Sequence, residues 1–478
     1  MLCTWRALCA TFVLWIATCN ATLLAPREDP WPNGPFTTNE QYVVDASGMS
    51  FTYAGVNWPG HLDAMVPEGL QYRSISDIMA LLKSIGINSI RLTYAIEMID
   101  QIEDNAGHDI PLQAAFVDAL GQENGTAIFE KVLSLNPSFS NDTTRLEVFD
   151  AIAAEAQQNE IYIHLDNHLS KAGWCCTYFD HNGWWGDSDF PVANWTRGLS
   201  YMADHASAWP NFISMSLRNE LRPPFGNSTL YAESYNWQDW YKYVKQGVEA
   251  INTANADILI FLSGLNSDTT LESVTNETAL RPGSGKFELD ESTANKIVLE
   301  LHNYDNINKG PGLENCTALN EELLTDGFRA LQSDAPNPFP VVMTEFGFVQ
   351  DDSTWQGTFA SCIEQFLADQ QAGWMIWSLG GSYYIREGVQ DYDESWGLLS
   401  HDWSSWRSPG HINGSFAALV DATLASNGIQ RGLSNNNGSS SSSNETSENA
   451  GNVKLHSSFN LWSVIGLGAI TTLVLWSY

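Results

Sequence analysis

The chain has 478 residues and a formal net charge of −34, from 56 acidic and 22 basic residues. This charge argues against a nucleic-acid partner, because binding to phosphates needs a basic surface. The hydrophobic content of 44% is enough for a sizeable core, and the length suits one large barrel domain with insertions.

The N-terminus resembles a secretory signal. Residues 1–21 contain Arg6, the apolar run Ala7–Thr18 and small residues near Ala21, which is the composition of a cleaved signal peptide. We therefore expect the mature protein to be extracellular, where disulfides form. The mature chain then keeps Cys175, Cys176, Cys316 and Cys362. We expect the pairs Cys316–Cys362 and Cys175–Cys176; the alternative is two bridges from the adjacent pair to Cys316 and Cys362.

Apolar, strand-like runs alternate with segments of helical spacing in the region 22–432. The expected strands are Phe51–Trp58, Ile87–Tyr94, Ile161–Asn167, Phe212–Glu220, Ile258–Gly264, Lys296–Tyr304, Phe339–Gly347 and Trp374–Leu379. The expected helices are Ile75–Ile85 (capped by Ser74 or Ser76), Arg145–Gln158, Arg197–Ala208, Trp237–Ala254, Glu321–Ser333, Thr358–Gln371 and Phe416–Ser426. A long polar insertion is expected from about Glu97 to Asn141. This alternation predicts an α/β fold, a (β/α)8 TIM barrel.

The C-terminus carries a second predicted targeting signal. Residues 433–449 form a Ser/Asn-rich linker that cannot bury a core, and residues 450–478 end in the apolar tail Leu461–Tyr478. Small residues, a polar spacer and a hydrophobic end predict a GPI-anchor signal with Asn449 as the attachment site. The alternative is a single-pass membrane helix, although no basic cluster follows the tail. Glycosylation acceptors are predicted at Asn124, Asn141, Asn194, Asn227, Asn276, Asn315, Asn413, Asn437 and Asn444.

Two glutamates, Glu220 and Glu345, each close an expected strand. Barrel enzymes keep their catalytic groups at the carboxyl ends of strands. Two carboxylates that converge on one cleft are the minimum equipment for cleaving a glycosidic bond. Sugar hydrolysis is therefore the leading hypothesis.

Short motifs at the strand ends extend this hypothesis. They are Tyr53-Ala-Gly-Val-Asn-Trp58, Ser89-Ile-Arg-Leu92, Leu165-Asp-Asn-His168, Leu217-Arg-Asn-Glu220, Leu301-His-Asn-Tyr304, Thr344-Glu-Phe-Gly347 and Trp377-Ser378. In this order, over residues 45–425, the chain resembles glycoside hydrolase family 5, of the cellulase type. The segments Trp174–Cys176, Asn182–Gly186 and Gly381–Gly388 are similar to a branch of that family in plants and fungi.

The resemblance implies a role for each matching residue. It implies that Glu220 is the acid/base, that Glu345 is the nucleophile, and that Arg91 and the Tyr304 hydroxyl keep Glu345 ionised. The implied sugar-binding or supporting residues are Trp58, His168, Asn219, His302 and Trp377. Arg91 as a core ion pair and His302 as a structural histidine remain alternatives.

Other residues near the strand ends are open to two interpretations. Asp166 is expected to brace its strand. Trp174, Trp184 and Trp185 line the cleft or pack around the cysteine pair. In the last loop Tyr383, Tyr384, Arg386 and Glu387 are candidates for shaping the cleft.

We expect no metal and no cofactor. The first strand has no His-x-His, and Asp166 with His168 is not a complete ligand set. The predicted activity is a monomeric, retaining glycoside hydrolase acting on a β-glycan. Endo-β-glucanase is the first choice; a mannanase, a small β-glycosidase and a wall-remodelling transglycosylase are alternatives. The rival of another class is a non-catalytic glycan-binding surface protein. Contact with a membrane is expected only through the lipid anchor.

Overall fold

The computed structural model describes residues 31–308, 315–429 and 431. Eight strands close a parallel barrel in the order β10-β11-β4-β5-β6-β7-β8-β9. They are β4 (Ala54–Trp58), β5 (Ser89–Ala95), β6 (Tyr162–Leu169), β7 (Phe212–Ser216), β8 (Leu259–Ser263), β9 (Ile297–Asn303), β10 (Val341–Phe346) and β11 (Gly373–Ile376). Every residue of these strands is buried, as expected when helices cover a parallel sheet. The predicted (β/α)8 barrel is confirmed.

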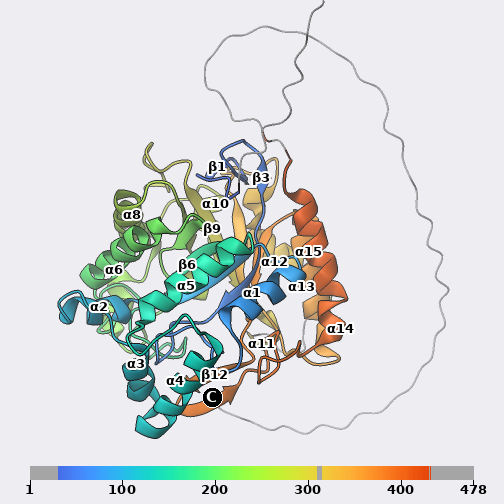
Figure 1. Cartoon of the computed structure of the whole chain (residues 1–478). Coiled ribbons are helices and arrows are strands. Elements are labelled where there is room, and N and C mark those ends of the chain that lie inside the picture. Colours follow the sequence, from blue (N-terminus) through green and yellow to red (C-terminus); the bar gives the residue numbers. More distant parts are fainter. Residues whose placement is uncertain (1–30, 309–314, 430, 432–478) are drawn as a thin grey trace, which may run out of the picture. The chain divides into compact units, whose positions relative to one another are not determined.

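Helices surround the strands (Figure 1). They are α1 (Ile75–Ser84), α2 (Ile96–Asp104), α3 (Leu112–Leu120), α4 (Gln122–Leu135), α5 (Arg145–Gln158), α6 (Val192–His205), α7 (Ser228–Ser234), α8 (Trp237–Ala254), α9 (Leu265–Asp268), α10 (Glu272–Thr275), α11 (Asp305–Asn308), α12 (Cys316–Asp326), α13 (Thr358–Gln370), α14 (Pro409–Ile412) and α15 (Ser415–Ser426). Ser74, one of the two expected caps, begins α1 by accepting a hydrogen bond from the Asp77 N–H at 3.1 Å.

The expected polar insertion between Glu97 and Asn141 is largely helical. It contains most of α2 and all of α3 and α4. Apolar side chains recur along these helices, and Ile99, Phe116 and Phe129 are buried. The many polar residues between them lie on the solvent face, so a mainly polar composition conceals amphipathic helices.

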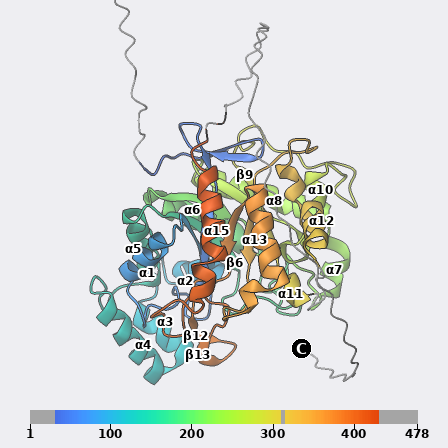
Figure 2. The ribbon, with the colours of Figure 1, turned by 90° about the vertical axis from the view of Figure 1, so that its right-hand side faces the viewer.

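A hairpin of β12 (Ser382–Arg386) and β13 (Val389–Asp393) follows the last barrel strand. Figures 1 and 2 show it beside α3 and α4, at the end of the barrel where the carboxyl ends of the strands lie. The predicted strand Trp374–Leu379 was therefore too long, because β11 ends at Ile376 and the chain turns into this hairpin.

A small antiparallel sheet covers the opposite end of the barrel. It consists of β1 (Thr37–Asn39), β2 (Tyr42–Val44) and β3 (Ser50–Phe51). The Ser50 N–H donates to Ile429 O and the Gly428 N–H donates to Ser50 O, both at 2.9 Å. Segments from both ends of the described chain therefore meet on this face.

Three predicted segments lie outside the described residues: the signal peptide 1–21, the linker 433–449 and the anchor signal 450–478 with Asn449. In the part that is described, no helix combines the length and the apolar character that crossing a bilayer requires.

Candidate active site

Both predicted glutamates lie at the carboxyl end of the barrel. Glu345 belongs to β10. The strand before Glu220 is shorter than predicted, since β7 ends at Ser216, and Glu220 adopts a positive φ of 45°. Its N–H donates to Asp268 Oδ2 at 2.8 Å. This contact fixes a backbone conformation that non-glycine residues adopt rarely, and such conformations cluster at functional sites.

The two carboxyl groups share one neighbour, the imidazole of His302. Nδ1 of His302 lies 3.2 Å from Glu220 Oε1 and 3.6 Å from Glu345 Oε2. One oxygen of each glutamate and one ring nitrogen all lie within 4.8 Å of one another. The two acids are therefore brought together from positions far apart in sequence.

Glu345 is held by two strong donors. Arg91 Nη1 donates to Oε1 at 2.6 Å, and the Tyr304 hydroxyl donates to Oε2 at 2.9 Å. Burial raises the pKa of Glu345, while His302 and Arg91 oppose this rise. Hydrogen bonds from a cation and a hydroxyl stabilise the ionised carboxylate.

The surroundings of Glu220 favour a proton. Burial raises the pKa of Glu220 to about 7, although Arg222 and Arg91 oppose the shift. Burial also lowers the pKa of His302 to about 4, so that the imidazole between the two acids is neutral at higher pH. Below about pH 7 the Glu220 carboxyl is therefore protonated, whereas Arg91 and Tyr304 donate hydrogen bonds to the carboxyl group of Glu345.

Arg91 organises the floor of the site. It is fully buried, and besides Glu345 it donates to Asn57 Oδ1 and Asn219 Oδ1, both at 2.8 Å. Asp166 Oδ1 lies 3.0 Å from its Nη2. Asp166 Oδ2 in turn accepts from His168 Nδ1 at 2.6 Å. As expected, Asp166 braces other side chains, and it does not line the cleft.

A cleft of about 420 Å³ opens over these groups. The predicted residues His168, Trp174, Asn219, Glu220, His302, Tyr304, Glu345, Trp377 and Arg386 line it. Trp377 stacks on His168 with ring centroids 5.5 Å apart, so its plane is fixed beneath the opening. An aromatic plate of this kind suits the apolar face of a sugar ring.

Three of the predicted tryptophans do not line the cleft. Trp58 is fully buried and donates to Glu68 O at 2.9 Å, so it supports the loop after β4 without reaching the cleft. Trp184 and Trp185 are also fully buried, and their rings pack on each other at 4.9 Å and on α6 and α8 side chains. The interpretation of these two as cleft residues is therefore wrong, and the ring contacts that they make are with each other and with residues of α6–α8, not with the cysteine pair.

The sequence did not indicate several further cleft residues. Residues Asn266, Ser267, Thr269, Ile307, Glu394 and Trp396 also line it. They lie on loops or in the four-residue helices α9 and α11, which are too short for a periodic pattern to mark them. Asp268, which holds the Glu220 backbone, was missed for the same reason.

The structure pairs Cys316 with Cys362, and it bonds the adjacent Cys175 and Cys176 to each other, as expected. The first pair joins α12 to α13. The second lies in the wall of the cleft.

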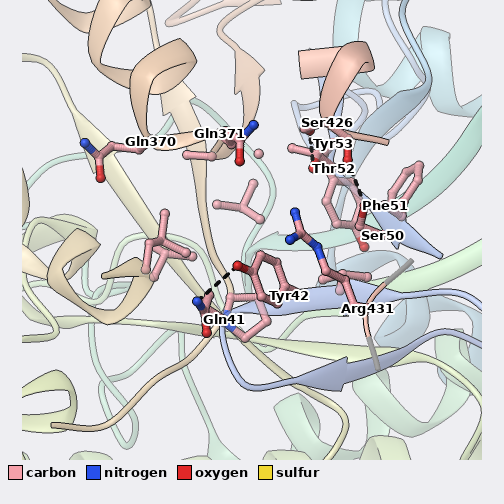
Figure 3. A pocket seen from close by; sticks show the side chains of 17 residues that line it. Gln41, Tyr42, Ser50, Phe51, Thr52, Tyr53, Gln370, Gln371, Ser426 and Arg431 are labelled. Atoms are coloured by element: carbon pink, nitrogen blue, oxygen red, sulfur yellow. Dashed lines mark hydrogen bonds between the residues drawn. The ribbon is translucent and has the colours of Figure 1, made fainter. Parts of the chain in front are cut away.

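A second cavity, of about 100 Å³, lies at the far end of the barrel (Figure 3). Its walls come from β2, β3 and the first residues of β10 and β11. There Gln41 Nε2 donates to the Tyr42 hydroxyl at 3.2 Å, and the Arg431 guanidinium lies 4.0 Å from the Tyr42 ring. The N-terminal face of a barrel contributes stability, so we assign this cavity no role in the chemistry.

Comparison with known proteins agrees with the geometry. The model of the family "Cellulase (glycosyl hydrolase family 5)" matches residues 44–382. A glycosyl hydrolase 5 family protein of Chamaecyparis obtusa is 32% identical over 405 residues, which cover 82% of this chain and 67% of that protein. An endoglucanase of Paenibacillus polymyxa is 22% identical over 387 residues, covering 79% and 85%.

Solved structures share the architecture. An endocellulase from Pyrococcus horikoshii, in a complex with cellotetraose, has a TM-score of 0.60 at 19% identity, covering 81% of this chain and 99% of that one. The catalytic domain of the major endoglucanase from Xanthomonas campestris pv. campestris has a TM-score of 0.57 at 16% identity, with the same coverage. With the family match over most of the barrel, and with two glutamates converging in its cleft, the chain belongs to glycosyl hydrolase family 5 and is a cellulase-like glycoside hydrolase.

Proposed function

We propose that the chain hydrolyses β-glucans with retention of anomeric configuration, by double displacement. Glu345 attacks the anomeric carbon while Glu220 protonates the departing oxygen, and water then releases the glycosyl group with Glu220 as base. The observation that carries this proposal is the shared contact with His302, which leaves oxygens of the two acids within 4.8 Å. Retaining enzymes keep their carboxyls about 5–5.5 Å apart, whereas inverting enzymes need about 6.5–9.5 Å.

The substrate class rests on the relatives. Two of the relatives named above are endoglucanases, and the endocellulase structure holds cellotetraose. Trp377 and the neutral polar groups around it suit an uncharged sugar. A panel of β-1,4- and β-1,3-glucans, mannan and xyloglucan, assayed near pH 5, will show which glycan is cleaved.

Covalent labelling tests the mechanism. A 2-deoxy-2-fluoro-β-glycosyl fluoride should add one sugar to the protein, and mass spectrometry should find it on Glu345. The variant Glu345→Gln should not be labelled and should lose nearly all turnover. Glu220→Gln should reduce turnover of substrates with poor leaving groups by about 10²–10⁴-fold, the usual contribution of a general acid. Labelling of another residue, or near-normal activity of Glu345→Gln, would overturn the assignment.

Catalysis without a metal stays a prediction. Glu220, His302 and Glu345 lie close enough to share an ion. However, the Arg91 guanidinium touches Glu345 at 2.6 Å and repels a second cation there. Dialysis against EDTA should leave kcat/KM unchanged. Loss of activity that zinc or magnesium restores would contradict this prediction.

We also propose that the enzyme acts outside the cell, attached by the lipid anchor predicted at Asn449, and as a monomer. One of the relatives is named an extracellular endoglucanase, which supports secretion. A phosphatidylinositol-specific phospholipase C should release activity from intact cells, whereas a transmembrane protein would stay in the membrane fraction.

A further inference from the structure

Two segments meet at one end of the cleft. Trp174 lies in the loop after β6, and Arg386 ends β12. The Arg386 guanidinium carbon lies 3.4 Å from the centroid of the Trp174 ring. Trp174 also contacts Tyr383 of the hairpin, with centroids 5.6 Å apart, and meets Trp377 edge-on at 6.2 Å. The contact therefore bridges two loops directly beside the aromatic plate.

A buried acid completes this wall. Glu394 is only 3% exposed, yet it lines the cleft. Its Oε2 accepts from Arg386 Nη1 at 2.9 Å, and its Oε1 accepts from the Trp396 N–H at 3.0 Å. Arg386 Nε is buried and makes no hydrogen bond; Glu387 Oε2, at 3.8 Å, is too far for one. The wall thus offers the carboxylate of Glu394, which lines the cleft and can accept hydrogen bonds from sugar hydroxyls.

The wall lies on the glycone side of the bond to be cleaved. Glu220 must protonate the leaving oxygen, so the leaving group lies beside Glu220 and the residues near it, Asn266–Thr269. The sugar that becomes attached to Glu345 rests instead on Trp377, on the side of Arg386 and Glu394. Trp174 meets Trp377 edge-on and has the Arg386 guanidinium over its ring, so this pair borders the place of that sugar.

The rest of the protein braces the hairpin. The Tyr384 N–H donates to Glu68 Oε2 at 2.6 Å, and the Tyr384 ring packs edge-on against Phe116 of α3 at 4.8 Å. Gln390 Nε2 donates to Leu120 O at 2.9 Å. Figures 1 and 2 show α3 and α4 next to β12 in both views. A wall supported in this way keeps its position when substrate binds.

We propose that Trp174, Arg386 and Glu394 close the glycone end of the cleft, so that the enzyme removes single sugars from the non-reducing ends of β-glucans. This inference rests on the proposed function and adds exo action to it. Glu394 and Arg386 are its specificity-determining residues, which bind the hydroxyls of the terminal sugar. The sequence favoured endo action, and the two hypotheses predict different substrates.

Oligosaccharides with a blocked non-reducing sugar distinguish exo action from endo action. Two aryl β-glucan oligosaccharides are compared that differ only in a 4,6-O-benzylidene acetal on the non-reducing sugar. The wild-type enzyme should cleave the free substrate and release a monosaccharide. It should cleave the capped one with kcat/KM at least about 100-fold lower, as expected for a site that requires substrate hydroxyls. Values within about threefold of each other would overturn the inference while leaving the retaining mechanism intact.

Variants test the wall itself. Glu394→Gln should lower kcat/KM on the free substrate roughly 10- to 150-fold, the value of hydrogen bonds to a charged group. Trp174→Ala should raise the ratio of capped to free substrate cleaved, because it opens the wall. Glu249→Gln, on the exposed face of α8, is the matched control and should change neither.

These experiments distinguish failure of the proposed wall from failure of the proposed function. If the ratio of capped to free substrate cleaved is unchanged in Trp174→Ala and Glu394→Gln, the proposed wall is contradicted. This holds even if the wild-type enzyme prefers substrates with an unblocked non-reducing end. A purely structural role for Glu394 would lower activity on both substrates equally. Failure of the fluoro-sugar to label Glu345, with no turnover of either substrate, would instead contradict the proposed function.

Discussion

Glu220 and Glu345 are the same residue type in one cleft, and their hydrogen-bond donors distinguish them. Glu345 accepts from Arg91 and Tyr304, whereas the oxygen Oε1 of Glu220 faces His302. Donors to a carboxylate favour its ionised form, and burial without them favours the protonated one. Two identical side chains can thus serve as anion and acid at one pH.

The pH dependence of kcat/KM should reflect the different protonation of Glu220 and Glu345. With a poor leaving group, kcat/KM should fall above about pH 7, because burial raises the pKa of Glu220 to about 7 and its ionised form has no proton to give. It should also fall in acid, where Glu345 becomes protonated. For a dinitrophenyl glycoside, whose leaving group departs unprotonated, kcat/KM should not fall above about pH 7. If both substrates keep the same alkaline limb, Glu220 is not the acid.

Tyr304→Phe tests the support of Glu345, the proposed nucleophile. The variant removes the hydroxyl that donates to Glu345 Oε2 at 2.9 Å. Hydrogen bonds to charged groups contribute about 1.5–3 kcal/mol, so kcat/KM should fall roughly 10- to 150-fold. Loss of a donor raises the pKa of a carboxyl, so the acidic limb should move to higher pH. An acidic limb that does not move would show that Tyr304 acts in another way.

Among the elements, those with a strong local signal were predicted best. The helix α8 has its predicted bounds, Trp237–Ala254, and α5 begins at Arg145 as predicted, after the capping box of Thr144 and Glu147. The hairpin β12–β13 was not foreseen, because its pairing and its contact with α3 depend on tertiary packing that local pattern does not encode.

In the site, too, residues in recognisable motifs were predicted, and a residue placed by tertiary packing was not. Arg91 and Glu345 lie in barrel strands and Tyr304 directly follows one, all in family-like motifs, and the structure brings them together. Glu394 reaches the cleft only because a loop and a hairpin carry it there. No spacing in the sequence marks it.

The disulfide between α12 and α13 should stabilise the fold. Cys316 and Cys362 are separated by 46 positions. The loop-entropy relation gives about 4 kcal/mol for a loop of this size, and typical measured values are about 2–4 kcal/mol. Replacing both residues with serine should lower the free energy of unfolding by about 2–4 kcal/mol in denaturant titrations.

The adjacent pair is the control for this measurement. A bond between Cys175 and Cys176 closes almost no loop, so the double serine variant should unfold close to the wild-type midpoint. Equal losses in the two double variants would show that loop length is not the cause.

At the scale of the whole molecule, buried acids link stability to pH. Burial raises the pKa of Glu220 to about 7 and that of Glu300 to about 8. The folded protein therefore binds these protons more tightly than the unfolded chain does. Their contribution is complete below the usual carboxyl pKa and is lost as pH rises through about 7–8. Repulsion within a chain of net charge −34 acts in the same direction.

Between pH 5 and pH 8 Glu300 should contribute a loss of stability on the order of a few kcal/mol. The buried histidines with a lowered pKa, His61, His164, His168 and His302, act in the opposite direction below about pH 6.5. Thermal or denaturant unfolding at the two pH values measures the difference. Glu300→Gln removes one of the titrating groups, so its unfolding should depend less on pH. A Glu300→Gln variant whose unfolding depends on pH as strongly as that of the wild type would contradict this linkage.

The pairing of Ser50 with Gly428 and Ile429 places both ends of the folded region on the face away from the glutamates. A resin, a reporter domain or a second enzyme joined through this face would leave the mouth of the barrel turned toward the solution. Insoluble cell-wall fibres could then reach an immobilised catalyst without steric hindrance from its support.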